Sequence, residues 1–198
     1  MTARTRQPPQ PRQRSGGRSE HVRQAVGGAV LELLREGRFP FTTVDVAERA
    51  EVNRRTLYRW WPTHDDLLAE ALSQHTPTLP VPDTGSWATD LRSFAHQVAA
   101  FAADPVDLTM TRIMVSGMHP DFNAAVVEHY RPVMEGWHQM LERAVARGEA
   151  SSDHDATTVV NTVVSPLFLA PLTTGRAPGP ESVDRLVDLV LDATRPRS

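Results

Sequence analysis

Apolar residues recur every three or four positions along most of the chain, which is the spacing of an amphipathic helix. Val22, Val26 and Leu33 follow this spacing. Gly37 supplies a C-terminal stop, so the sequence predicts a first helix over residues 19–37. Capping residues set the starts of three more helices: a short one from Thr42 or Thr43 to Ala50, one from Asn53 to Trp60 or Trp61, and one that begins at Thr63.

Beyond a proline-rich linker at 76–86, the same spacing predicts helices near residues 87–103, 106–118, 121–148, 153–173 and 180–194. No convincing two-residue alternation appears, so we predict an all-α protein. Residues 1–18 are rich in proline, glutamine, arginine, serine and glycine and have no apolar periodicity. That composition predicts a disordered basic arm.

Charge is distributed unevenly, although the formal net charge is only −3. Residues 1–64 carry 12 arginines and six acidic residues, whereas the rest of the chain carries nine arginines and 18 acidic residues. A basic N-terminal third on an acidic remainder indicates a polyanionic partner at one end of the molecule. The alternative is a basic arm that only keeps the chain in solution.

Several function classes lack their sequence signals. The chain has no cysteine, which excludes disulfides and thiolate metal sites. We find no apolar run approaching the roughly 18 residues that a bilayer requires and no secretory signal, so we expect a cytoplasmic protein without a membrane partner. The sequence offers no nucleophile elbow, phosphate loop, cofactor fingerprint or metal-binding His pair, so we expect no enzyme activity, cofactor or metal.

Three short helices followed by a fourth, with a tight turn between the second and the third, form a helix-turn-helix pattern. Leu57 and Trp61 lie four residues apart in the third helix and are expected to face the core. The side chains left outward suit DNA, because arginine reads guanine bidentately and threonine contacts bases. They are Arg54, Arg55, Thr56 and Arg59.

The stretch from Thr42 to Leu68, TTVDVAERAEVNRRTLYRWWPTHDDLL, resembles the DNA-binding signature of TetR/AcrR repressors. The shared pattern is a Thr-Thr opening, a Val-Ala pair, a turn, Thr-Leu-Tyr, an aromatic residue and a Leu-Leu pair. The resemblance is specific over residues 19–72, and residues 161–191 also resemble the C-terminal domains of one actinobacterial branch of the family. It implies a DNA-binding domain over 19–75 and a helical ligand-binding and dimerisation domain over 87–198. It also implies a repressor that a small-molecule effector releases from a palindromic operator.

Matched position by position, the resemblance assigns the DNA contacts. Thr43 and Tyr58 match phosphate-contacting positions, and Arg54, Arg55 and Thr56 match the base-reading face. Arg59 and Trp60 match positions that contact the backbone or the bases. For Tyr58 and Trp60 the alternative is a ring that only packs at the surface. The complete expected set on double-stranded DNA is Thr42, Thr43, Asn53, Arg54, Arg55, Thr56, Tyr58, Arg59, Trp60 and His64. The alternative role for Thr42 and Thr43 is capping alone.

Two positions depart from the family pattern. Glu51 stands in the turn where the family usually has glycine, so a non-glycine residue with positive φ is expected there, at a cost on the order of 1 kcal/mol. His64 stands where the family usually offers lysine to a phosphate. A histidine carries a fixed charge only when it is protonated, so we expect weaker DNA binding at pH 8 than at pH 6.

The second half contains methionines and aromatic residues that suit an adaptable ligand pocket. Met110, Met114 and Met118 recur every four residues, although a stripe of this kind is also typical of a core. Arg112 and His138 are the expected polar anchors if the ligand is acidic. The expected ligand-binding residues are Phe94, Phe101, Met110, Arg112, Met114, Met118, Met134, Trp137 and His138.

The last two helices are expected to form a two-fold four-helix dimer interface. The apolar residues assigned to it are Val159, Val160, Val163, Val164, Leu167, Leu186, Val190 and Leu191. The alternative is that the same residues form the core of one chain. Two other functions stay open at this point: an all-α enzyme or small-molecule carrier with an incidental helix-turn-helix, and a constitutive DNA-binding protein without a ligand.

Overall fold

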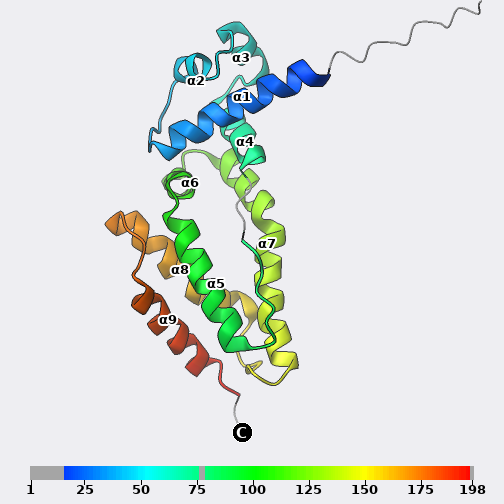
Figure 1. The fold of residues 1–198 in the computed structure, drawn as a ribbon, viewed down its shortest axis with the longest axis vertical. Coiled ribbons are helices and arrows are strands. Elements are labelled where there is room, and N and C mark those ends of the chain that lie inside the picture. The colour runs from blue at the N-terminus through cyan, green and yellow to red at the C-terminus, as the bar shows by residue number, and fades with distance from the viewer. Residues whose placement is uncertain (1–15, 76–78, 197–198) are drawn as a thin grey trace, which may run out of the picture.

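The computed structural model describes residues 16–75 and 79–196, and within these ranges the chain forms nine helices and no strands (Figure 1). The prediction of an all-α protein is confirmed. The helices are α1 (Gly16–Arg35), α2 (Thr43–Arg49), α3 (Arg54–Trp60), α4 (His64–Gln74), α5 (Trp87–Ala103), α6 (Pro105–Ser116), α7 (Pro120–Ala146), α8 (Ala156–Thr174) and α9 (Pro180–Ala193). Helix α1 begins three residues before the expected start, so the predicted disorder of residues 1–18 is wrong for 16–18, and the rest of that prediction concerns residues outside the described ones.

Side-chain caps fix the starts of the three short helices near the N-terminus. The hydroxyl of Thr42 accepts a hydrogen bond from the Asp45 amide, and the Asp45 carboxylate accepts one from the Thr42 amide. Thr63 forms the same reciprocal box at the start of α4, and Asn53 caps α3. Each cap satisfies backbone donors that a helix leaves unpaired at its first turn. The predicted helix starts are therefore confirmed, with a physical reason for each.

One apolar core joins α1–α4 to α6 and to the beginning of α7. Leu33, Leu57 and Leu68 are buried in it together with Ile113 of α6 and Phe122 of α7. Helices on both sides of the expected linker therefore pack against the same core.

A buried carboxylate strengthens this N-terminal core. Glu70 of α4 accepts hydrogen bonds from Arg23 Nε at 3.1 Å, from the Trp61 indole at 3.2 Å and from the Gln74 amide at 3.1 Å. The Gln74 amide also donates to the Arg23 carbonyl at 2.8 Å. These bonds hold α1, the end of α3 and α4 in one arrangement.

A second core lies between α5, the remainder of α7, α8 and α9. It contains Trp87, Phe94, Trp137, Val163 and Val187, all of them buried. Figure 1 shows α7 running along the length of the molecule, from the neighbourhood of α4 toward the end that carries the C-terminus. Because α7 belongs to both cores, it connects them mechanically.

Helix α8 corrects one expectation from the sequence. By length and composition alone, Ala156–Thr174 could cross a membrane. In the fold Val159, Val163 and Leu167 are buried against the second core. Val164 and Phe168 line a cavity, and Leu169 is exposed. Core helices of soluble proteins pass the same test of length and composition, so this property is weak evidence for a membrane segment.

Candidate DNA interface and ligand cavity

Helix α3 presents a basic, exposed face at the end of the molecule opposite the C-terminus (Figure 1). Within α3, all of which the structure describes, Leu57 alone is buried, and Trp61 directly after it is buried as well. The prediction that these two residues face the core is confirmed. Arg55, Tyr58 and Arg59 are exposed, so they can reach a partner without rearrangement of the core.

The turn between α2 and α3 has the geometry expected from the sequence. Glu51 has a φ of 53°, which makes it the one non-glycine residue with positive φ in the described part of the chain. The turn is closed by a hydrogen bond of 3.0 Å from the Val52 amide to the Ala47 carbonyl.

Several of the residues expected to contact DNA already have partners within the chain. The hydroxyl of Thr42 is bonded to Asp45, and the side-chain oxygen of Asn53 accepts from the Arg55 amide at 2.8 Å. Arg54 pairs with Glu48 at 3.0 Å, but both side chains are exposed. Because exposed pairs contribute little free energy, Arg54 can exchange Glu48 for a phosphate at small cost.

Trp60, the last residue of α3, and His64, the first residue of α4, are only partly available for contact with DNA. Trp60 is half-buried, its ring centroid lies 5.6 Å from that of Trp61, and it packs against the N-terminal core. The guanidinium of Arg59 lies 6.0 Å from the Trp60 ring. The imidazole of His64 donates from Nε2 to the Phe41 carbonyl at 2.8 Å, which leaves Nδ1 as the atom that could meet a phosphate.

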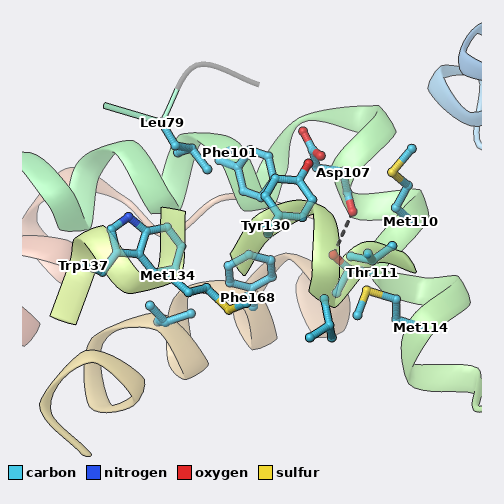
Figure 2. Close-up of a pocket in the computed structure, with 13 residues that line it drawn as sticks. Leu79, Phe101, Asp107, Met110, Thr111, Met114, Tyr130, Met134, Trp137 and Phe168 are labelled. Carbon is cyan, nitrogen blue, oxygen red and sulfur yellow. Dashed lines mark hydrogen bonds between the residues drawn. The ribbon is translucent and has the colours of Figure 1, made fainter. Parts of the chain in front are cut away.

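A cavity of about 180 Å³ lies between α5, α6, α7 and α8 (Figure 2). Its walls are almost entirely apolar and contain three aromatic rings packed edge to face: Phe101 lies 5.7 Å from Tyr130 and 6.0 Å from Phe168 between ring centroids. The residues that line it are Leu79, Phe101, Asp107, Met110, Thr111, Met114, Val126, Val127, Tyr130, Met134, Trp137, Val164 and Phe168.

Four of the nine residues expected at a ligand site lie elsewhere. Met118 is 78% exposed because α6 ends at Ser116, and Gly117 follows it with a left-handed φ of 67°. Phe94 is buried in the second core, with its ring 5.1 Å from that of Trp137. Arg112 is exposed, and the structure places neither it nor His138 on the cavity wall. The five that do line the cavity are Phe101, Met110, Met114, Met134 and Trp137.

The polar groups of the cavity were missed in the sequence. Asp107 and Thr111 lie on the same face of α6 as Met110 and Met114, since the four residues follow the spacing of a helix face. Tyr130 precedes Met134 by one turn of α7. The helical spacing in the sequence already places these polar residues on the same helix faces as the methionines.

Asp107 is a buried carboxylate at the cavity wall. It is 4% exposed, and its Oδ1 accepts a hydrogen bond of 2.8 Å from Nε2 of His75, the residue that caps the C-terminus of α4. Burial raises the pKa of Asp107, and the hydrogen bond from His75 opposes that shift. The cavity is therefore tied to the last residue of the DNA-binding helices by one hydrogen bond.

A second histidine–aspartate pair crosses between the same parts of the molecule. His119, the residue before α7, lies 2.6 Å from Asp65 in the first turn of α4, measured from Nδ1 to Oδ1. Its ring also packs against Phe39, with 5.4 Å between centroids. Helix α4 is thus held near both ends by side chains from α6 and from the loop before α7.

Most residues expected at a dimer interface belong to the core of one chain. Five of the eight valines and leucines are buried within the protomer, and Val164 lines the cavity instead. Apolar spacing identifies a helix face but does not tell whether that face meets its own chain or another copy. The buried five are Val159, Val160, Val163, Leu167 and Val190. On α8 and α9 the exposed large apolar side chains are Leu169 and Leu189.

Comparison with known proteins agrees with this arrangement. A family model described as "Tetracyclin repressor-like, C-terminal domain" matches residues 81–190. The chain is 34% identical to the HTH-type transcriptional regulator AqdR of Rhodococcus erythropolis, over 76% of this chain and 74% of that protein. It is 30% identical to the HTH-type transcriptional regulator YdeS of Bacillus subtilis, over 80% of this chain and 82% of that protein.

Among solved structures, the TetR family transcription regulator SCO0332 superimposes with a TM-score of 0.64 and 25% identity, over 89% of this chain and 100% of that one. The family model covers more than half of the sequence, and the helix-turn-helix and the helical C-terminal part are both present. The chain therefore belongs to the TetR family and is a DNA-binding transcriptional regulator.

Proposed function

We propose that the protein is a repressor that binds a palindromic operator as a homodimer and is released by a small molecule bound in the cavity between α5, α6, α7 and α8. The observation that carries the DNA-binding part is the exposed basic face of α3, held by the buried Leu57. A helix of this kind fits the major groove, where arginine reads guanine.

Arg55 is the side chain assigned to base reading. It lies in the first turn of α3 and is exposed, and among the described residues it has no ion pair. Arg54 and Thr56, on either side of it in the chain, are assigned to the same base-reading face, and Tyr58 is assigned to a phosphate. For the dimer, the exposed sides of α8 and α9 around Leu169 and Leu189 are the surfaces that a second copy would cover.

Release by an effector follows from geometry. Successive major grooves on one side of DNA lie about 34–36 Å apart, so a small rotation of the two α3 helices prevents simultaneous docking. Helix α4 contacts α7, and His75 at its end contacts Asp107 at the cavity wall. A ligand that displaces α6 or α7 therefore displaces α4 and with it the DNA-binding helices. A regulator that binds DNA acts where its DNA lies, so the proposed location is the cytoplasm.

Arg55→Ala tests the DNA-binding proposal. Duplexes are selected from a random library with the full-length protein, and the affinity for the selected sequence is measured by fluorescence anisotropy at fixed salt. Loss of a bidentate arginine–guanine contact is expected to cost about 1–3 kcal/mol of binding free energy and to relax the preference at one base pair.

Arg112→Ala is the matched control, because Arg112 is an exposed arginine on α6 and its removal should leave the affinity unchanged. If the parent protein selects no duplex even at low salt, the proposal fails. If Arg55→Ala weakens all duplexes equally, Arg55 contacts phosphate and not a base.

A further inference from the structure

Within the described residues, four lining side chains carry a nitrogen or oxygen atom, and the indole nitrogen of Trp137 lies away from the other three, which are Asp107, Thr111 and Tyr130 (Figure 2). The hydroxyl of Thr111 is already used, since it donates to the Asp107 carbonyl at 2.7 Å inside α6. Two groups are left for a ligand, the Asp107 carboxylate and the Tyr130 hydroxyl. Figure 2 shows the hydroxyl end of Tyr130 pointing toward that carboxylate.

The Tyr130 hydroxyl is buried, and the Asp107 carboxylate is the group with which it interacts, but this contact lies outside normal hydrogen-bond geometry. Burial and the neighbouring Asp107 carboxylate raise the pKa of Tyr130, so the phenol stays neutral and keeps its proton. Buried polar groups in proteins are almost always hydrogen-bonded, and an unpaired one calls for a partner. A ligand with a polar end in this corner would supply that partner.

The sign of the local charge restricts which polar end fits. The groups that face this corner are the Asp107 carboxylate, Asp104 before α6, the Tyr130 phenol and His75. An anionic ligand would meet the Asp107 carboxylate in a poorly solvated site, which is strongly unfavourable. A cationic ligand would have to be desolvated opposite a carboxylate that His75 already partners. A neutral hydrogen-bond donor incurs neither cost and gains a charge-assisted bond.

The other residues of the cavity wall determine the size and shape of the apolar part of the ligand. Phe101, Tyr130, Phe168 and Trp137 offer ring faces and edges, and Met110, Met114 and Met134 adapt to the outline of a flat molecule. The cavity volume of about 180 Å³ is slightly larger than the roughly 150 Å³ of an engineered cavity that holds benzene. One or two fused rings fit such a volume.

We infer that the effector is an uncharged, flat aromatic molecule that carries a hydrogen-bond donor, and that this donor binds the Asp107 carboxylate beside the Tyr130 hydroxyl. This inference rests on the proposed function of the cavity. The polar anchors considered in the sequence for the case of an acidic ligand, Arg112 and His138, do not line the cavity, whereas Asp107 does.

Four probes of the same ring system test the inference by calorimetric titration of the full-length protein at pH 7: naphthalene, 2-naphthol, 2-methoxynaphthalene and 2-naphthoate. We expect 2-naphthol to bind about 10- to 100-fold more tightly than its methyl ether, because a hydrogen bond to a charged group contributes roughly 1.5–3 kcal/mol. We expect 2-naphthoate to bind more weakly than naphthalene.

Two variants test whether the preference for 2-naphthol over its methyl ether depends on Asp107 and Tyr130. Asp107→Asn should reduce the advantage of 2-naphthol over its methyl ether and reduce the penalty on 2-naphthoate. Tyr130→Phe should reduce the advantage of 2-naphthol while leaving the binding of naphthalene unchanged. Thr111→Val is the matched control, since it removes a hydroxyl from the same wall that is already satisfied within α6, and it should preserve the order of the four probes. Circular dichroism establishes that each variant is folded.

The outcomes distinguish a failure of the inferred ligand chemistry from a failure of the proposed effector site. If naphthalene and 2-naphthol bind with equal affinity to the parent protein, the cavity is a ligand site without donor selectivity, and the inference is wrong. If the donor preference persists in both Asp107→Asn and Tyr130→Phe, it is wrong as well. If none of the four probes binds, the proposed role of the cavity fails together with the inference.

Discussion

Leu57→Ala is expected to lower the free energy of unfolding by about 2–5 kcal/mol and to abolish tight DNA binding, because truncation of a buried leucine leaves a cavity. The effect on DNA should exceed that of any single arginine variant. Helix α3 has seven residues, and Leu57 is the one that is buried within it. Without this contact the helix keeps its caps but is no longer held against the core formed by α1, α2 and α4.

Unfolding in urea, followed by circular dichroism, measures the loss of stability, and hydrogen exchange locates it. Amides of α3 should exchange faster than in the parent, while α5 and α8 keep their protection. Val115→Ala is the matched control: Val115 is an aliphatic residue of α6 that is 68% exposed, so its truncation should change stability by less than about 0.5 kcal/mol. Equal stability of the two variants would show that α3 is not held by Leu57.

The N-terminal helices could be predicted closely because their starts depend on local chemistry. Thr42, Asn53 and Thr63 cap helices through residues two or three positions along the chain, so the sequence contains the whole interaction. The positive φ of Glu51 was predictable for a similar reason, although that expectation came from the family pattern and not from spacing. Local hydrogen bonds and turn geometry need no knowledge of the rest of the fold.

The lining of the cavity was predicted less well because it depends on where helices end and which neighbours they meet. Met118 continues the spacing of Met110 and Met114, but Gly117 ends α6 one residue earlier and turns the chain away. Phe94 and Phe101 share a face of α5, yet only Phe101 reaches the cavity, because Trp137 covers Phe94. Such differences arise from packing between distant segments, which periodicity does not contain.

The interface residues of α8 show a limit of another kind. Val159, Val163 and Leu167 form a continuous apolar stripe, and the same stripe would serve a dimer or the core of a single chain equally well. The fold assigns it to the core. A sequence pattern of this kind indicates that an apolar helix face is buried. It does not tell whether the same chain or a second copy covers that face.

Glu70→Ala is expected to lower the free energy of unfolding by roughly 2–3 kcal/mol, because it leaves the buried indole N–H of Trp61 without an acceptor and removes a buried ion-pair partner. We expect no larger loss of stability, because the Arg23 side chain is 53% exposed and its guanidinium can be hydrated when the carboxylate is removed. Glu70→Gln keeps an acceptor for Trp61 and should lose only about 1 kcal/mol. Denaturant titration of the three proteins measures these differences.

Glu48→Ala provides the control, since the pair between Glu48 and Arg54 is exposed on both sides and should contribute less than about 1 kcal/mol. The two glutamates also differ in their expected effect on DNA. Glu70 connects α1, the end of α3 and α4, so its removal should weaken DNA binding through loss of the arrangement of helices. Glu48 is a negative charge beside Arg54, so its removal should strengthen DNA binding. If both variants lost stability equally, or if Glu70→Ala bound DNA as tightly as the parent, the network around Glu70 would not be what holds α3 in place.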